Sequence, residues 1–280
     1  MRGNGPSEIR KRQTPGPQDQ KSKCNPGSGA GKLSVVSLGP GKSDYMAPSA
    51  KAALLKAEVI VAYKTYMDLI EPEILEGKET LSSGMMGEIS RCRMAIEKAL
   101  GGKDTAIVSS GDSGIYGMAG LVIELLADQD LLGRLSVEVI PGIPALSAAA
   151  ALLGAPLMHD FAVISLSDLM TPWDEIEARV KAAARTDFVL VIYNPRSKKR
   201  DWQLSSVKEV VLNYRSGDTP VGIVRNAARK GMSTLITTLS EMDESVVDML
   251  SILLVGNSKT RVIGDKMVTP RGYFEKYGKK

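Results

Sequence analysis

Short apolar runs rich in β-branched residues alternate with helical stretches over the first half of the chain. The strand candidates are residues 33–38, 59–63, 105–109 and 137–140. The helix candidates between and after them are residues 47–57, 88–100, 116–127 and 145–153. This βαβα order predicts a mostly parallel sheet covered by helices.

The pattern changes near residues 154–160, and the later strand candidates lie closer together. They are residues 161–166, 188–193, 221–225, 233–238 and 252–255, with a final pair near 261–268. Close spacing indicates mixed or antiparallel pairing. One helix is expected to begin at Thr171 and Pro172, with Thr171 as N-cap, and another to span 205–214.

The chain therefore reads as two α/β domains with a ligand cleft between them. The predicted limits are a basic disordered tail at 1–31, a first domain at 32–157, a second at 158–272, and a short tail at 273–280. Residues 1–32 carry a net charge of +5 and the rest −1, so the folded part has no basic patch typical of nucleic-acid binding.

The two cysteines, Cys24 and Cys92, and the lone His159 are too few for a Cys/His metal site or a disulfide framework. No apolar leader is visible at the N-terminus, and the one long uncharged run, 139–158, is interrupted by prolines and glycines. We expect no metal, no nucleic acid, no membrane span and a cytoplasmic location.

Three glycine-bearing turns follow strands of the first domain, at 38–44, 110–117 and 140–145. The first ends Gly-Lys-Ser but lacks the earlier glycine of a phosphate-binding P-loop, and Pro40 has no N–H to offer. A Rossmann fingerprint fails too, because Asp44 stands where its third glycine belongs. Three such turns at strand ends describe a crevice for a nucleotide-like ligand.

The second turn reads Gly111-Asp112-Ser113-Gly114-Ile115-Tyr116-Gly117. Its glycines allow a flat ligand to approach the backbone closely. Asp112 either caps the following helix or accepts hydrogen bonds from a ribose or a cationic amine. The residues alone leave both roles open.

Taken together, four segments resemble the tetrapyrrole methylases: VSLGPGKSDYM, SSGDSGIYGMAG, VEVIPGIPALSAAAALLGAPL and ILLVGNSK. The resemblance spans roughly residues 32–272. It implies a class III, non-Rossmann methyltransferase of two α/β domains, which binds S-adenosylmethionine between them. The family also implies a homodimer.

Further segments resemble the precorrin-3B C17-methyltransferase branch: GMMGEISRCRMAI, HDFAVISLSDLMTPW, VIYNPRSKKR and VRNAARKG. This branch implies C17-methylation with ring contraction of precorrin-3B, or of its counterpart cobalt-factor III, in cobalamin biosynthesis. One departure is Ser113, where the family usually has proline after Gly-Asp. Another corrin-pathway methylase of the same fold, or a non-catalytic nucleotide-binding module, remains the alternative.

The resemblance also implies site residues. The expected cofactor contacts are Gly39, Pro40, Gly111, Asp112, Ile115, Tyr116, Pro144, Ala145, Asn194, Ala227 and Leu250.

The tetrapyrrole substrate carries carboxylates around its rim, for which arginine is the preferred partner. The expected substrate contacts are Arg91, Arg93, Arg196, Lys198 and Arg225, with Arg229 a further candidate. Arg91 and Arg93 cannot share one helix face, and the basic loop 196–200 is equally well explained as a solubilising surface. Ring contraction invites a general acid or base, for which His159, Asp168, Ser165 and Tyr193 are candidates.

Overall fold

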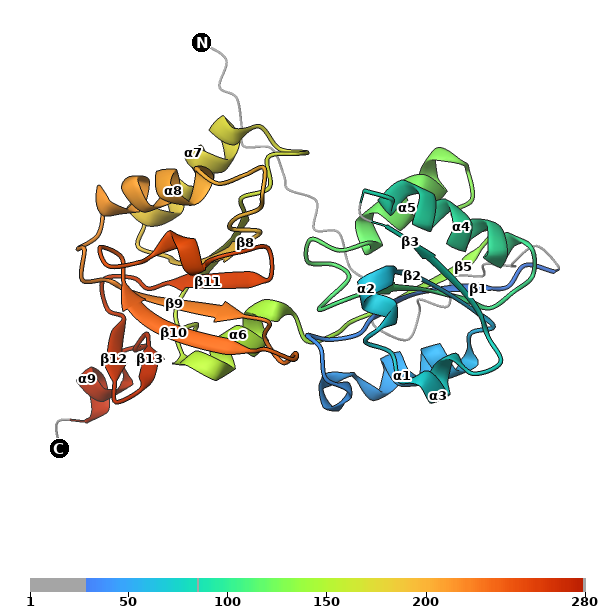
Figure 1. The fold of residues 1–280 in the computed structure, drawn as a ribbon, viewed down its shortest axis with the longest axis horizontal. Coiled ribbons are helices and arrows are strands. Elements are labelled where there is room, and N and C mark those ends of the chain that lie inside the picture. The colour runs from blue at the N-terminus through green and yellow to red at the C-terminus, as the bar shows by residue number, and fades with distance from the viewer. Residues whose placement is uncertain (1–28, 85, 279–280) are drawn as a thin grey trace, which may run out of the picture.

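The computed structural model describes residues 29–84 and 86–278, which form two separate five-stranded sheets and a small three-stranded one (Figure 1). Most of the predicted basic tail, and Cys24 in it, lies outside the described residues. Along these residues, no helix combines the length and apolar character needed to cross a membrane.

The first sheet has the strand order β3-β2-β4-β1-β5, and every pair in it is parallel. Its strands are β1 (Lys32–Ser37), β2 (Val59–Tyr63), β3 (Glu79–Ser83), β4 (Thr105–Ser109) and β5 (Ser136–Ile140). Its helices are α1 (Pro48–Lys56), α2 (Lys64–Met67), α3 (Pro72–Leu75), α4 (Glu88–Leu100) and α5 (Ala119–Asp128). The predicted parallel βαβα arrangement is confirmed.

Helices cover both faces of this sheet, with α4 and α5 on one side and α1 and α3 on the other (Figure 1). Alternate residues of β1 accordingly enter two cores: Leu33 and Val35 pack toward α4 and α5, and Val36 toward α1. Burial on both faces explains why these strands read as continuous apolar runs. In the first core the Cys92 side chain is fully buried, and burial raises the pKa of its thiol to about 12.

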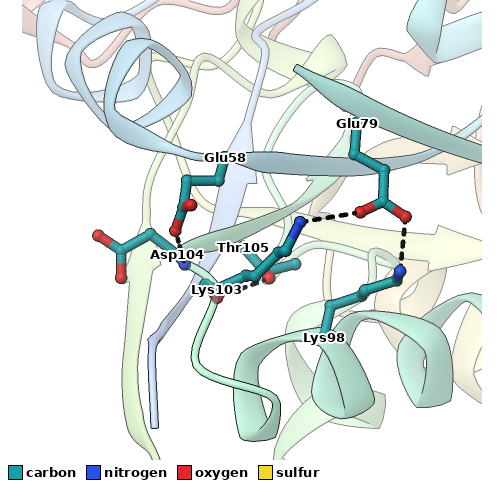
Figure 2. Close-up of polar contacts among 6 residues, drawn as sticks. All are labelled: Glu58, Glu79, Lys98, Lys103, Asp104 and Thr105. Atoms are coloured by element: carbon teal, nitrogen blue, oxygen red, sulfur yellow. Dashed lines mark hydrogen bonds and ion pairs between the residues drawn. The ribbon is translucent and has the colours of Figure 1, made fainter. Parts of the chain in front are cut away.

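Strand β3 is absent from the strands expected from the sequence. It is an edge strand of composition ETLSS with alternate residues exposed, so it carries little apolar pattern. Polar contacts at the N-terminal edge of the sheet hold it in place (Figure 2). Glu79 accepts hydrogen bonds from Lys98 of α4 at 2.5 Å and from Lys103 at 3.5 Å, and the Lys98 bond lowers the pKa of Glu79. Beside them, Glu58 accepts the backbone N–H of Asp104 at 3.0 Å.

The second sheet has the order β10-β9-β11-β8-β7. Its strands are β7 (Phe161–Ser165), β8 (Val189–Tyr193), β9 (Pro220–Arg225), β10 (Ser233–Thr238) and β11 (Ser251–Val255). Only β7 and β8 are parallel, and the other pairs are antiparallel, as the close strand spacing predicts. Helices α7 (Trp173–Arg185) and α8 (Gln203–Leu212) cover one face.

The other face is covered by α6 (Ala145–Leu153), which contacts β9, β10 and β11. Leu153 lies so close to β9 that a side chain at Gly222 would collide with it, at 2.3 Å from a Leu153 methyl carbon. Helix α6 therefore follows the last strand of the first sheet in sequence but packs on the second. The predicted domain limit at 157 stays a prediction.

A hairpin of β12 (Arg261–Ile263) and β13 (Lys266–Val268) adds to β6 (Gly154–Ala155) near the C-terminus. Two details differ from the predictions. Helix α7 has Pro172 as its N-cap with no side-chain cap, so Thr171 does not cap it. Within the predicted tail 273–280, the described part forms helix α9 (Tyr273–Tyr277).

Candidate functional site

The three glycine turns of the first domain meet at the C-terminal ends of β1, β4 and β5. Gly39 and Gly111 exchange backbone hydrogen bonds, at 3.1 Å from Gly39 N to Gly111 O and 2.7 Å in return. Gly142 packs onto the second turn and onto the end of β1: an added Cβ there would lie 2.5 Å from Gly111 O and 2.7 Å from Ser37 Cβ. Since the nearest atom is backbone, this contact requires glycine at 142.

Asp112 joins the second turn to the third. One carboxylate oxygen accepts the N–H of Gly114 at 2.8 Å and the other accepts the N–H of Gly142 at 2.9 Å. Helix α5 begins only at Ala119, with Met118 as N-cap and no side-chain cap. The helix-capping role considered for Asp112 is therefore wrong, because its carboxylate holds two turns together instead.

Buried hydroxyls that no sequence signal indicates lie beneath the turns. Ser37 Oγ accepts the N–H of Ser113 at 2.9 Å and donates to Ser113 Oγ at 3.0 Å. Ser109 Oγ accepts the N–H of Met118 at 3.2 Å. Serine at a strand end is too common for its sequence position to reveal such a pair.

Two tyrosines link the second turn and α6 to the second sheet. Tyr116 adopts a left-handed conformation, with φ of 52°, which excludes it from the helix expected at 116–127. Its hydroxyl donates to Val163 O at 3.1 Å, and its ring lies 5.4 Å from the Tyr193 ring. The Tyr193 hydroxyl accepts the N–H of Leu146, near the start of α6, at 3.0 Å. Burial raises the pKa of both phenols.

Loops after β8 and β9 complete this region. Asn194 is left-handed, with φ of 50°, and its side chain donates to Ser165 Oγ at 2.9 Å. Arg200, which is 6% exposed, donates to Asn194 O at 3.0 Å and so supports that conformation. Asn226 is also left-handed, and its N–H is accepted by Leu250 O at 3.0 Å.

The predicted cofactor residues are thus gathered from both halves of the chain. Ala145 begins α6 directly beside Gly111, with 3.6 Å between its N and a Cβ placed at Gly111. Ile115, Ala145 and Ala227 share one apolar cluster with α6. Pro144 is the N-cap of α6, and Leu250 is half-exposed. Their role in binding stays a prediction.

The predicted substrate residues are placed less uniformly. Arg91 is 4% exposed, and its guanidinium donates to Ser83 Oγ, Gly84 O and Glu88. Its charge therefore stabilises the end of β3 next to α4, whereas Arg93 is exposed.

In the second domain the three substrate candidates differ in what they contact. Arg196 donates to Glu244 O at 2.7 Å, and Arg225 pairs with Asp248 at 2.7 Å. Lys198 is exposed.

The catalytic candidates separate into two groups. Tyr193 and Ser165 are in register at the C-terminal ends of β8 and β7. Asp168 follows β7 and accepts from Gln203 at 2.8 Å. His159 precedes β7, and the strand separates it from Ser165 by roughly 13 Å or more. His159 therefore lies at the N-terminal end of β7, opposite to Ser165, and its Nδ1 accepts the N–H of Asp160.

Tyr193 allows a test by pH. The folded-state pKa of Tyr193 is raised, so the folded protein favours the neutral phenol. The stabilisation that results is fully present below the unfolded pKa of about 10. It is lost as pH rises from there through the folded pKa. We expect the unfolding free energy of the wild type to fall relative to that of Tyr193→Phe above about pH 10. Below that, loss of the acceptor for Leu146 N–H should leave a constant deficit of about 1 kcal/mol in the variant. Urea unfolding of both proteins measures the difference; one that is the same at every pH would contradict the assignment.

Known proteins resemble this chain in sequence and in fold. The family model for Tetrapyrrole (Corrin/Porphyrin) Methylases matches residues 32–243. A protein of Salmonella typhimurium named probable cobalt-factor III C(17)-methyltransferase is 49% identical over 86% of this chain and 99% of its own. The chain spans about half the length of several longer curated relatives that it matches.

Two solved structures share the fold. The crystal structure of the methyltransferase CobJ matches with a TM-score of 0.82 at 36% identity, over 86% of this chain and all of that one. A uroporphyrin-III C-methyltransferase from Thermus thermophilus, solved with S-adenosyl homocysteine, matches with a TM-score of 0.61 at 22% identity, over 81% of this chain and 97% of that one. The chain belongs to the tetrapyrrole methylase family.

Proposed function

We propose that this protein transfers a methyl group from S-adenosylmethionine to C17 of a corrin precursor, cobalt-factor III or precorrin-3B, with contraction of the ring. The observation that carries the proposal is the meeting of three glycine turns beside Tyr193 of the second domain. Gly39 and Gly111 join the first turn to the second, and the Asp112 carboxylate joins the second to the third. The name of the Salmonella relative supports the C17 position and the cobalt substrate.

The residues present suit a cationic adenosyl cofactor. Turns 111–117 and 142–145 contain one carboxylate, Asp112, and no lysine or arginine of their own. The backbones of Gly39, Gly111 and Gly142 lie together at the strand ends, so a ligand bound there would meet main-chain groups. The Thermus fold neighbour, solved with S-adenosyl homocysteine, supports this choice.

Once bound, S-adenosylmethionine supplies an electrophilic methyl group on a good leaving group. The protein therefore needs no covalent nucleophile, and its task is to hold the substrate carbon in line with the methyl group. Such positioning lowers the activation barrier by on the order of 7–11 kcal/mol. Backbone carbonyls of the turns and the negative charge of Asp112 would also stabilise the cation.

For the substrate, exposed basic groups are the natural carboxylate ligands. Lys198 and Arg93 are exposed, while Arg196 and Arg225 keep donors beyond those used within the protein. Tyr193, Ser165 and Asp168 remain candidates for proton transfer in ring contraction. Limits of 32–157 and 158–272 for the two domains, a homodimer and a cytoplasmic location belong to the same proposal.

The test is methyl transfer by the purified full chain from S-adenosylmethionine labelled in its methyl group. Cobalt-factor III and precorrin-3B are offered separately, and we expect label in one of them with a mass gain of one methyl group. Label only in a different corrin intermediate would indicate another methylase of this fold. Binding of S-adenosylmethionine without transfer would indicate a non-catalytic module, and no binding at all would overturn the proposal.

A further inference from the structure

Arg229 reaches from the second domain to two cofactor turns of the first. It lies in the loop after β9, and its Nε–H donates to Pro40 O at 2.7 Å. One of its terminal nitrogens donates to Ser110 Oγ at 2.8 Å. Pro40 and Ser110 directly adjoin Gly39 and Gly111, the pair that joins the first and second turns. A single side chain therefore contacts both turns.

Backbone packing reinforces this contact. The N–H of Lys42 donates to Ala228 O at 3.0 Å. A Cβ added at Gly41 would lie 2.5 Å from both Ala228 O and Arg229 Cγ, so the two loops touch at a distance that only glycine permits. Ala228 is left-handed, with φ of 56°, a conformation that is unfavourable for alanine and persists only where surrounding contacts impose it.

The partners of Arg229 distinguish it from Arg225 on the same segment. Arg225 pairs with the Asp248 carboxylate of its own domain. Within residues 29–84 and 86–278, Arg229 forms no ion pair, and the acceptors of its guanidinium are a carbonyl and a hydroxyl of the other domain. Both acceptors, Pro40 O and Ser110 Oγ, are neutral. Such contacts suit an arginine that positions the two domains rather than one that neutralises a carboxylate.

We propose that Arg229 is a positioning residue that fixes the second domain on the cofactor turns at Pro40 and Ser110, so that cofactor affinity depends on it. The inference rests on the proposed function, because the ligand of these turns is taken to be S-adenosylmethionine. Arg229 was expected as a candidate ligand for the substrate carboxylates, and the proposal instead assigns it to supporting the cofactor turns. Two of its donors are already occupied in holding those turns.

The experiment measures the dissociation constant of S-adenosylhomocysteine by calorimetry for the full chain and its variants. Arg229→Gln removes the clamp and is expected to weaken binding about tenfold or more, within the usual range of coupling between linked elements. Arg229→Lys, which retains one donor, should recover part of the affinity. Lys230→Gln is the matched control, since it removes the same charge from the adjacent exposed residue and should leave affinity unchanged.

Two further readouts separate positioning from a general loss of structure. In methyl transfer, Arg229→Gln should raise the KM for S-adenosylmethionine while the KM for the corrin substrate stays the same. Ser110→Ala removes one acceptor and should weaken cofactor binding by itself. In the Ser110→Ala background, Arg229→Gln should weaken cofactor binding by a smaller factor than it does in the wild type, because the two residues share a contact.

Equal affinities of the wild type, Arg229→Gln and Lys230→Gln would overturn the inference while leaving the proposed function intact. If Arg229→Gln does not fold, Ser110→Ala decides, and wild-type affinity in that variant would count against the clamp. Failure of the wild type itself to bind S-adenosylhomocysteine would instead overturn the proposed function.

Discussion

Gly142→Ala is expected to reduce kcat/KM for methyl transfer by about 100-fold or more, since a misplacement of reacting groups by about 1 Å has that effect. The new Cβ would lie 2.5 Å from Gly111 O and 2.7 Å from Ser37 Cβ, distances at which something must move. Backbone surrounds the position, so the third turn shifts away from the second. Overpacking of this kind also destabilises a protein by about 1–3 kcal/mol.

Gly120→Ala provides the matched control for Gly142→Ala. Gly120 follows the second glycine turn and lies in the first turn of α5, but an added Cβ there meets nothing within 4 Å. The variant should gain about 0.5–1 kcal/mol of stability from higher helix propensity and bind S-adenosylhomocysteine normally. Calorimetric affinity, urea unfolding and methyl transfer are measured for both variants. Equal affinities and rates would show that the contact between the turns does not shape the site.

Asp112→Ala is expected to produce the second large effect, a loss of cofactor affinity of about 100-fold. Both oxygens of Asp112 accept backbone N–H groups, and each hydrogen bond to a charged group contributes about 1.5–3 kcal/mol. Removal of the carboxylate leaves Gly114 and Gly142 without that acceptor and frees the third turn from the second. Asp112→Asn should be intermediate, with a loss of about tenfold, because one amide oxygen replaces two acceptors.

Asp104 supplies a matched control for Asp112. Its carboxylate also accepts a backbone N–H, that of Lys32 at 2.8 Å, but at the N-terminal ends of the strands of the same sheet, away from the glycine turns. Asp104→Asn should therefore lower stability without changing the affinity for S-adenosylhomocysteine. If Asp112→Asn likewise lowers stability and leaves affinity unchanged, Asp112 is structural only, and its place in the cofactor site must be abandoned.

The first sheet could be predicted closely from the sequence because its signals are local. Strands β2 and β4 and helix α4 have the limits that the apolar patterns indicate, and each glycine turn stands where expected, after a strand. Strand β3 was missed, since an edge strand half open to solvent has no continuous apolar run. Hydrophobic periodicity reflects the burial of side chains, so it gives no signal for a strand whose side chains are only slightly buried.

The partners of side chains could not be predicted in the same way. Asp112 had two plausible roles on sequence grounds, and only the approach of Gly142, 30 residues further along, shows that its carboxylate joins two turns and does not cap α5. His159 lies two positions before β7, at the end of that strand opposite to Ser165. Arg229 meets Pro40 across 189 residues of sequence. Helix α6 follows the first sheet along the chain and packs on the second.

The sequence by itself therefore determined the order of the buried strands and the longer helices, the positions of the glycine turns and the family, because these depend on neighbouring residues and on local backbone preferences. The tertiary structure decided which turn touches which, what Asp112 and Arg229 bind, and which end of a strand each candidate occupies. Those outcomes depend on distances between segments remote in sequence, and only the packed core sets such distances.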